Sequence, residues 1–172
     1  DTLSIANDKV QLTLGVRQQG VETKNFNATT GAIASSYDES ATTPMFALLV
    51  KPHEKVSLYA NYIEGLSQGP TAPSNAVNAG EVFPPYKSKQ YEIGAKFDLS
   101  GLGITLSAFQ ISRPNSFSRP ISDSDPRLIF GLDGQQRNRG IELNLFGTPM
   151  PGMRLLGGAA YTDAKLRRTR LG

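Results

Sequence analysis

The sequence predicts an all-β protein, an antiparallel up-and-down meander of about seven strands. Three observations support this. Apolar and polar residues alternate over several short stretches, and no run approaches the roughly 18 apolar residues that a membrane-spanning helix needs. Tight turns recur at one interval: breaks at 52–54, 100–103 and 148–152 put 49 residues between Pro52 and Gly101, and 49 again between Gly101 and Met150.

The first three strands are expected at 10–17, 43–51 and 56–62. In the first, Val10, Leu12, Leu14 and Val16 occupy alternate positions, which is the period-two pattern of a strand with one apolar face. The third alternates in the same way. The second has a blurred pattern, because adjacent leucines place apolar groups on both faces.

The remaining strands are expected at 90–99, 103–112, 140–145 and 153–164. The clearest alternation in the chain lies in 90–99, where Tyr91, Ile93, Ala95, Phe97 and Leu99 alternate with Gln90, Glu92, Gly94, Lys96 and Asp98. Strand 140–145 alternates too, whereas 103–112 and 153–164 are blurred by apolar neighbours. No segment has a convincing helical period.

Strand and loop lengths favour a membrane barrel. About ten residues is the length of a tilted membrane-crossing strand. Between the short turns, roughly twenty residues rich in Ser, Asn, Gly and Pro are expected to form long loops, all on one side. Short turns at one rim and long loops at the other are typical of outer-membrane barrels. Two alternatives are a soluble β-rich binding or adhesion module, and a segment of a general diffusion porin.

Composition argues against catalysis and metal chemistry. The chain has no cysteine and one histidine, His53, in a turn between strands, so neither a Ser-His-Asp relay nor a zinc motif is supported. Asp123 and Asp125 precede a proline, which is typical of a turn rather than a cation site. The net charge of +3 is dispersed, and no basic stripe interleaved with aromatics suggests nucleic-acid binding. We expect neither an enzyme nor a metal site.

Five phrases of the sequence resemble consecutive barrel strands of TonB-dependent siderophore receptors, in order and at similar spacing over nearly the whole chain. They are VQLTLGVR at 10–17, VSLYANY at 56–62, QYEIGAKFD at 90–98, RNRGIEL at 137–143 and LLGGAAYTDAK at 155–165. The resemblance implies that residues 1–172 are a middle-to-late part of a 22-stranded transmembrane β-barrel. The plug, the early strands, the terminal strands and a signal peptide are expected to be absent.

The same resemblance implies a function and its partners. Such a receptor lies in the outer membrane of a Gram-negative bacterium, binds ferric siderophore from outside and imports it with energy from the TonB complex, through the plug region. The resemblance implies no covalently bound cofactor, with ferric siderophore as the transported ligand. Outer-membrane lipid and lipopolysaccharide are the expected surroundings, and no nucleic acid is expected.

Candidate ligand residues come from two of the long loops. A ferric siderophore is polar or anionic around a compact iron centre, so aromatic faces and guanidinium donors suit its recognition. The alternative for the aromatics is a girdle at the membrane boundary, and for the arginines contact with solvent or lipopolysaccharide phosphates. The candidates are Phe83 and Tyr86 in one loop, and Arg113, Phe117, Arg119, Arg127 and Phe130 in the other.

Overall fold

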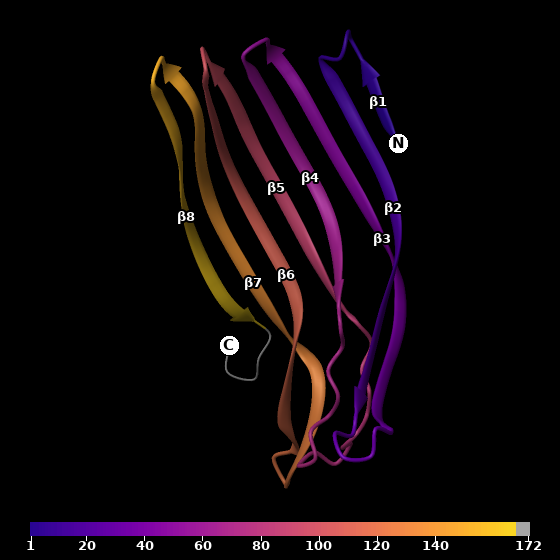
Figure 1. The fold of residues 1–172 in the computed structure, drawn as a ribbon. Helices are drawn as coiled ribbons and strands as arrows, with labels where there is room; N and C mark the ends of the chain where they lie inside the picture. The colour runs from indigo at the N-terminus through magenta and orange to yellow at the C-terminus, as the bar shows by residue number, and fades with distance from the viewer. Residues whose placement is uncertain (168–172) are drawn as a thin grey trace.

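The computed structural model describes residues 1–167, which form one open antiparallel sheet of eight strands in chain order (Figure 1). None of these residues is helical, and no helix in them is long and apolar enough to cross a membrane. The predicted all-β meander is therefore confirmed. The strands are β1 Thr2–Ile5, β2 Val10–Phe26, β3 Ile33–His53, β4 Val56–Ser67, β5 Tyr86–Leu99, β6 Leu102–Ser122, β7 Asp125–Met150 and β8 Met153–Arg167.

Short turns gather at one rim of the sheet, the upper rim in Figure 1. The three predicted turns are confirmed at 54–55, 100–101 and 151–152, and the turn at 6–9 joins the short β1, which the sequence pattern did not predict. The central turn needs glycine twice. Gly101 has a positive φ of 93°, and a Cβ on Gly147, whose φ is 148°, would lie 2.0 Å from the carbonyl oxygen of Gly101.

At the opposite rim, two of the three predicted long loops are wrong. Residues 18–26 and 33–42 continue β2 and β3, and most of 113–139 continues β6 and β7, so that β7 reaches 26 residues. Polar residues continue the strands here because the backbone hydrogen bonds of a β-ladder form without an apolar face. Alternation of apolar and polar residues, by contrast, appears in the sequence only where one face of a strand is apolar. Residues 68–85 are the one long connection outside the strands in the described part of the chain.

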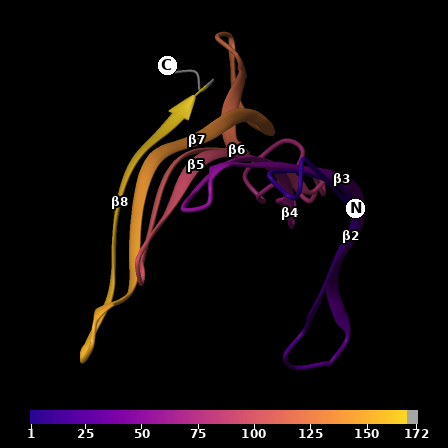
Figure 2. The same cartoon turned by 90° about the horizontal axis from the view of Figure 1, so that it is seen from above.

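The sheet curves like part of a cylinder wall, as the view from above shows (Figure 2). Its two faces differ in chemistry. Cross-strand partners build an apolar row on the convex face, where Ile93 is 63% exposed and Ile141 is 56% exposed. The row consists of Leu12, Leu48, Ala60, Ile93, Ala108, Ile141 and Tyr161.

In the described part of the chain, no second sheet covers the apolar face. Within residues 1–167 the buried apolar side chains are Tyr37, Ala72 and Ala76, all away from the convex row. A soluble sandwich would need a dry interface between two sheets. Along β5, the convex apolar positions run from Tyr91 to Leu99, about 27 Å of strand. With a tilt of about 40°, this covers about 20 Å of membrane height, close to the apolar band of a transmembrane barrel.

Candidate functional site

An aromatic row marks the boundary of the convex apolar band on the side of the long hairpins. Phe46 stacks on Tyr62 with ring centroids 6.0 Å apart, and Tyr62 contacts Tyr91 at 4.9 Å. Amphipathic rings of this kind suit the level of lipid headgroups. In β7 and β8 the same row holds Arg139 and Asp163. The next row outward on this face is also charged, with Glu64, Lys89 and Arg137 in β4, β5 and β7. The girdle of this segment is therefore made by Phe46, Tyr62 and Tyr91.

The concave face carries a polar network at the height of the apolar band. The Tyr59 hydroxyl donates a hydrogen bond to Glu92 Oε1 at 2.7 Å, and Lys96 Nζ lies 5.2 Å from the centre of the Tyr59 ring. Two strands away, Asn144 Nδ2 donates to Glu142 Oε1 at 2.8 Å. We call Tyr59, Glu92, Lys96, Glu142 and Asn144 the concave cluster. Polar groups on this face and lipid-like groups on the other are the arrangement of a barrel with a wet or filled lumen.

One acceptor beside this cluster has no hydrogen-bond donor within residues 1–167. Asn61 lies opposite Glu92 in the register, and its Oδ1 is buried without a partner in this part of the chain. A buried acceptor left unpaired is costly. The concave face can therefore accept hydrogen bonds or cations from whatever lies inside the curve of the sheet.

Segment 68–85 is docked between two strands that are distant in sequence. At one end, the Tyr37 hydroxyl of β3 accepts the backbone N–H of Gly69 at 3.1 Å, and Tyr37 is only 5% exposed. At the other end, Asn78 binds the backbone of Phe130 in β7: its Nδ2 donates to the Phe130 carbonyl at 2.9 Å, and its Oδ1 accepts the Phe130 N–H at 3.0 Å. The segment therefore joins β3 to β7 across the mouth of the sheet.

The candidate aromatics Phe83 and Phe130 meet in this docked segment. Their ring centroids are 5.5 Å apart in an edge-to-face arrangement, a favoured geometry for aromatic pairs. Next to them, the Val77 N–H donates to the Leu128 carbonyl at 2.8 Å. These two predicted residues, from different predicted loops, form one contact at the outer mouth.

Arg113 and Tyr86 lie on the concave side. The register of β5 and β6 puts both on the same face as Glu92, and the Arg113 Nε donates to Gln136 Oε1 at 3.0 Å. Tyr86 begins β5 opposite Ser67. Neither residue therefore belongs to the aromatic row on the convex face.

Arg119 and Arg127 have carboxylate partners within the β6–β7 hairpin, where Phe117 lies opposite Gly131. Arg119 Nε donates to Asp133 Oδ2 at 2.9 Å, and Arg127 Nη2 donates to Asp125 Oδ2 at 2.7 Å. The Arg127 side chain is 71% exposed, and its hydrogen bonds hold the pKa of the Asp125 carboxyl below its usual range. This hairpin leans away from the concave side, opposite to the β2–β3 hairpin (Figure 2). The seven candidates therefore do not form one cluster.

The histidine and the acidic pair have structural roles in turns. His53 Nδ1 accepts the backbone N–H of Lys55 at 3.2 Å, as expected for a turn residue. Asp125 is held by Arg127, and its backbone N–H donates to Ser122 Oγ at 3.1 Å. Within residues 1–167, no group of three or more His, Cys, Asp or Glu side chains could hold a metal ion.

Sequence reasoning missed the residues that hold the candidates in place: Asn78, Asp133 and Gln136. These partners are distant in sequence, and single polar residues in loop-like segments give no periodic signal. The concave cluster is visible in the sequence only as the polar half of the alternation in 56–62, 90–98 and 140–145. Nothing in that pattern distinguishes a solvent-facing strand from a lumen-facing one.

The fold and its two faces define a section of the wall of a transmembrane β-barrel. Comparison with known proteins identifies the family: residues 1–171 match the TonB dependent receptor-like β-barrel. The chain belongs to the TonB-dependent receptors, a family of transport receptors. Like the rest of this family, it is located in the outer membrane of a Gram-negative bacterium. Membership in this family argues against both alternatives, the soluble β-rich binding or adhesion module and the general diffusion porin.

Similar proteins span several organisms. The chain is 47% identical to the ferrichrome receptor FcuA of Yersinia enterocolitica, over 98% of this chain and 22% of that protein. The ferric preacinetobactin receptor BauA of Acinetobacter baumannii is 49% identical with a TM-score of 0.81, covering 99% of this chain and 25% of BauA. Fiu, a ferric-catecholate import receptor of Escherichia coli, shares the fold with a TM-score of 0.71 at 19% identity, over 96% of this chain and 27% of Fiu. The chain thus spans about a quarter of each.

Proposed function

We propose that this chain is part of the barrel of an outer-membrane receptor that binds ferric siderophore and imports it with energy delivered through TonB. The observation that carries the proposal is the family match over residues 1–171, combined with a lipid-facing convex side and a polar concave side. FcuA and BauA are both receptors for ferric siderophores, which supports the ligand class. The complete receptor would contain a plug, early strands and terminal strands in addition to this segment.

The concave cluster is the natural contact surface for that plug. Glu92 and Glu142 present carboxylates on the inner face, and the unpaired Asn61 Oδ1 adds a buried acceptor. A plug that offers arginine, lysine or amide donors here would satisfy these groups in an environment shielded from water, where charge-assisted hydrogen bonds are strong. TonB would act on the receptor through the plug region.

The ligand would contact the outer mouth of this segment. Arg113 and Tyr86 are the strongest candidates, since both face the concave side, and the Phe83–Phe130 pair borders the same mouth. Phe117, Arg119 and Arg127 stay in the proposal as residues of the β6–β7 hairpin. Their arginines already pair with Asp133 and Asp125, so we expect a smaller contribution from them.

FcuA and BauA, at nearly equal identity to this chain, are receptors for different ferric ligands. The experiment therefore uses a panel of hydroxamate, catecholate and mixed ferric siderophores. Binding to whole cells is measured for the intact receptor and for Arg113→Ala, Arg113→Lys and the triple variant with Arg113, Arg119 and Arg127 replaced by alanine. Arg154→Ala, at the rim of the short turns, is the matched control.

Loss of one charge-assisted hydrogen bond should weaken binding of the cognate siderophore by roughly tenfold in Arg113→Ala. The triple variant should bind only slightly less than Arg113→Ala, because the other two arginines are paired. Arg154→Ala should bind normally. Unchanged affinity of the triple variant at normal surface expression would remove these arginines from the site, while the transport proposal would be tested separately by iron uptake.

A further inference from the structure

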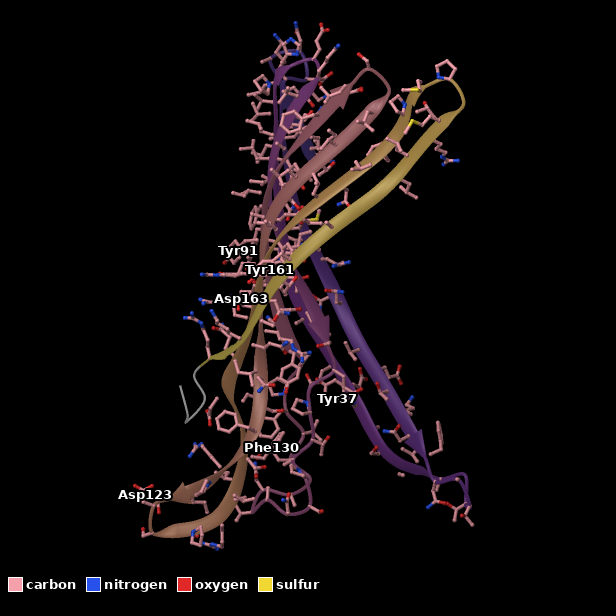
Figure 3. All side chains as sticks on the ribbon, turned by 90° about the vertical axis from the view of Figure 1, so that its left-hand side faces the viewer. Tyr37, Tyr91, Asp123, Phe130, Tyr161 and Asp163 are labelled. Atoms are coloured by element: carbon pink, nitrogen blue, oxygen red, sulfur yellow. The ribbon has the colours of Figure 1, made fainter. Side chains whose placement is uncertain are left out.

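A groove lies on the convex face, on the side of the sheet opposite the concave cluster. Its volume is about 650 Å³, and its lining is formed mainly by Tyr91, Ile93, Ala108, Arg139, Ile141 and Tyr161. The register places these side chains on the lipid-facing side of β5, β6, β7 and β8. Tyr91, Tyr161 and Asp163 lie together at one height of the sheet, on the side away from Tyr37 (Figure 3).

The groove follows from one small residue. Ala108 lies between Ile93 and Ile141 in the cross-strand row, so that the surface is lower at this one position of β6 than at its two partners. Tyr91 and Tyr161 are 50% and 69% exposed at the two sides, and both line the groove. A shallow apolar groove of this kind, open to the hydrocarbon region, suits a linear acyl chain.

Cations gather where the groove reaches the headgroup level. Arg139 lies one row beyond Ile141, and its Nε donates to Gln110 Oε1 at 2.6 Å, which holds the guanidinium at the end of the groove. Carboxylates accompany this patch: Glu64 pairs with Lys89 at 3.8 Å, Asp163 pairs with Lys165 at 2.8 Å, and Asp133 lines a hollow with Lys87 and Lys89. The cations on this part of the convex face are Lys87, Lys89, Arg137, Arg139, Lys165 and Arg167.

We propose that this groove is a binding site for one phosphorylated lipid of the outer leaflet, with an acyl chain over Ala108 and a headgroup phosphate held by Arg137 and Arg139. Cations outnumber carboxylates on this part of the face, which favours an anionic headgroup, and guanidinium groups bind phosphate through directed pairs of hydrogen bonds. The apolar floor excludes an inorganic anion as the sole occupant. The site depends on the membrane location of the chain and not on which ligand the receptor transports.

The test measures lipid binding by the intact receptor in mild detergent, using native mass spectrometry. The probes are bisphosphorylated lipid A, its monophosphorylated form and its dephosphorylated form. The variants are Arg137→Ala with Arg139→Ala, the conservative Arg139→Lys, and Ala108→Phe, which fills the groove without changing charge. Lys9→Ala with Arg154→Ala removes two cations at the opposite rim as the matched control. Heat-dependent gel mobility verifies that each barrel is folded.

The double arginine variant should bind bisphosphorylated lipid A about tenfold or more weakly and should lose its preference for the phosphorylated forms, since each surface cation contributes on the order of 1 kcal/mol. Arg139→Lys should keep most of that preference. Ala108→Phe should weaken all three lipids alike, and the control should bind normally. Unchanged binding in the double variant would overturn the proposal. An equal loss of lipid binding in the control variant would also overturn the proposal. So would the finding that the receptor is a dimer and that Ala108→Phe dissociates it, because the groove would then be occupied by a second copy of the receptor.

Discussion

The ring of Tyr59 lies over Gly94, its direct partner on the neighbouring strand. A Cβ on Gly94 would lie 2.5 Å from Tyr59 Cζ, far inside van der Waals contact. The same relationship recurs between Phe109 and Gly140 and between Phe146 and Gly103, where the corresponding distances are 2.5 Å and 2.6 Å. The concave face thus keeps its rings against the sheet instead of projecting them inward.

Gly94→Ala should therefore displace the Tyr59 ring and break its hydrogen bond to Glu92. Crowding of this kind typically costs about 1–3 kcal/mol, and we expect a lower thermal midpoint of the folded receptor. Gly20→Ala is the matched control, because no atom lies within 4 Å of a Cβ at that strand position. Equal midpoints for the two variants would show that the ring has room to move.

Asn78→Ala should loosen segment 68–85. The substitution removes both hydrogen bonds to the Phe130 backbone, which together contribute on the order of 1–3 kcal/mol. Hydrogen exchange at Val77 and Phe130 should rise at least several-fold, with faster proteolysis of the segment. Asn75→Ala, exposed in the same segment, provides the comparison. If Asn78→Ala keeps the same protection from hydrogen exchange, the Phe83–Phe130 ring contact and the hydrogen bond from Val77 to the Leu128 carbonyl are sufficient to hold the segment.

The tip of the β6–β7 hairpin should respond to acid. The pKa of Asp125 is lowered in the folded state by hydrogen bonds from Arg127, so the stabilisation is present above the ordinary carboxyl value of 3.8. It is lost as pH falls through the lowered value. Backbone exchange at 123–127, compared between pH 6 and pH 2.5, should show the tip opening only at the lower pH. In Asp125→Asn the hairpin tip should already be open at pH 6. Backbone exchange at 123–127 that shows the same degree of opening at both pH values in the unaltered protein would contradict the role given to the Asp125–Arg127 pair.

The chain on its own should not remain a monomer. β1 and β8 are the edges of an open sheet, and β8 exposes a 15-residue strand with unpaired backbone groups. Light scattering of the purified segment should show association, or a requirement for detergent, and no pore activity in bilayers is expected. A clean monomer without detergent would contradict this. Proline has no backbone N–H to pair with an added strand, so Ala160→Pro in the edge strand β8 should reduce edge-to-edge association relative to Ala160→Ser.

The membrane-spanning part of the fold could be predicted from sequence because one face of it is apolar. Strand 90–99 alternates over its whole length, and the turns at Pro52 and Gly101 are local signals. Outside the membrane both faces of a hairpin meet water, so alternation disappears while the backbone ladder persists. For this reason the sequence pattern predicts loops where the structure has strands, at 18–26, 33–42, 113–122 and 125–139.

The candidate site could be predicted only in part. Residue chemistry selected Arg113, Phe83 and Phe130, and two of these meet in the structure. Their partners Asn78 and Gln136 are set by tertiary pairing across 52 and 23 positions of the chain, which no local pattern encodes. The groove over Ala108 was equally hidden, since it arises from the residues on both neighbouring strands.

The long hairpins at the outer mouth have a consequence for how such receptors diversify. Their ladders are held by backbone amides and carbonyls, which every residue except proline supplies equally. Side chains on β2–β3 and β6–β7 beyond the aromatic row can therefore be exchanged without dismantling the wall beneath them. A lineage can retune the chemistry of its mouth one substitution at a time, whereas a side chain added at an inner glycine such as Gly94 or Gly103 would collide with the aromatic ring beside it.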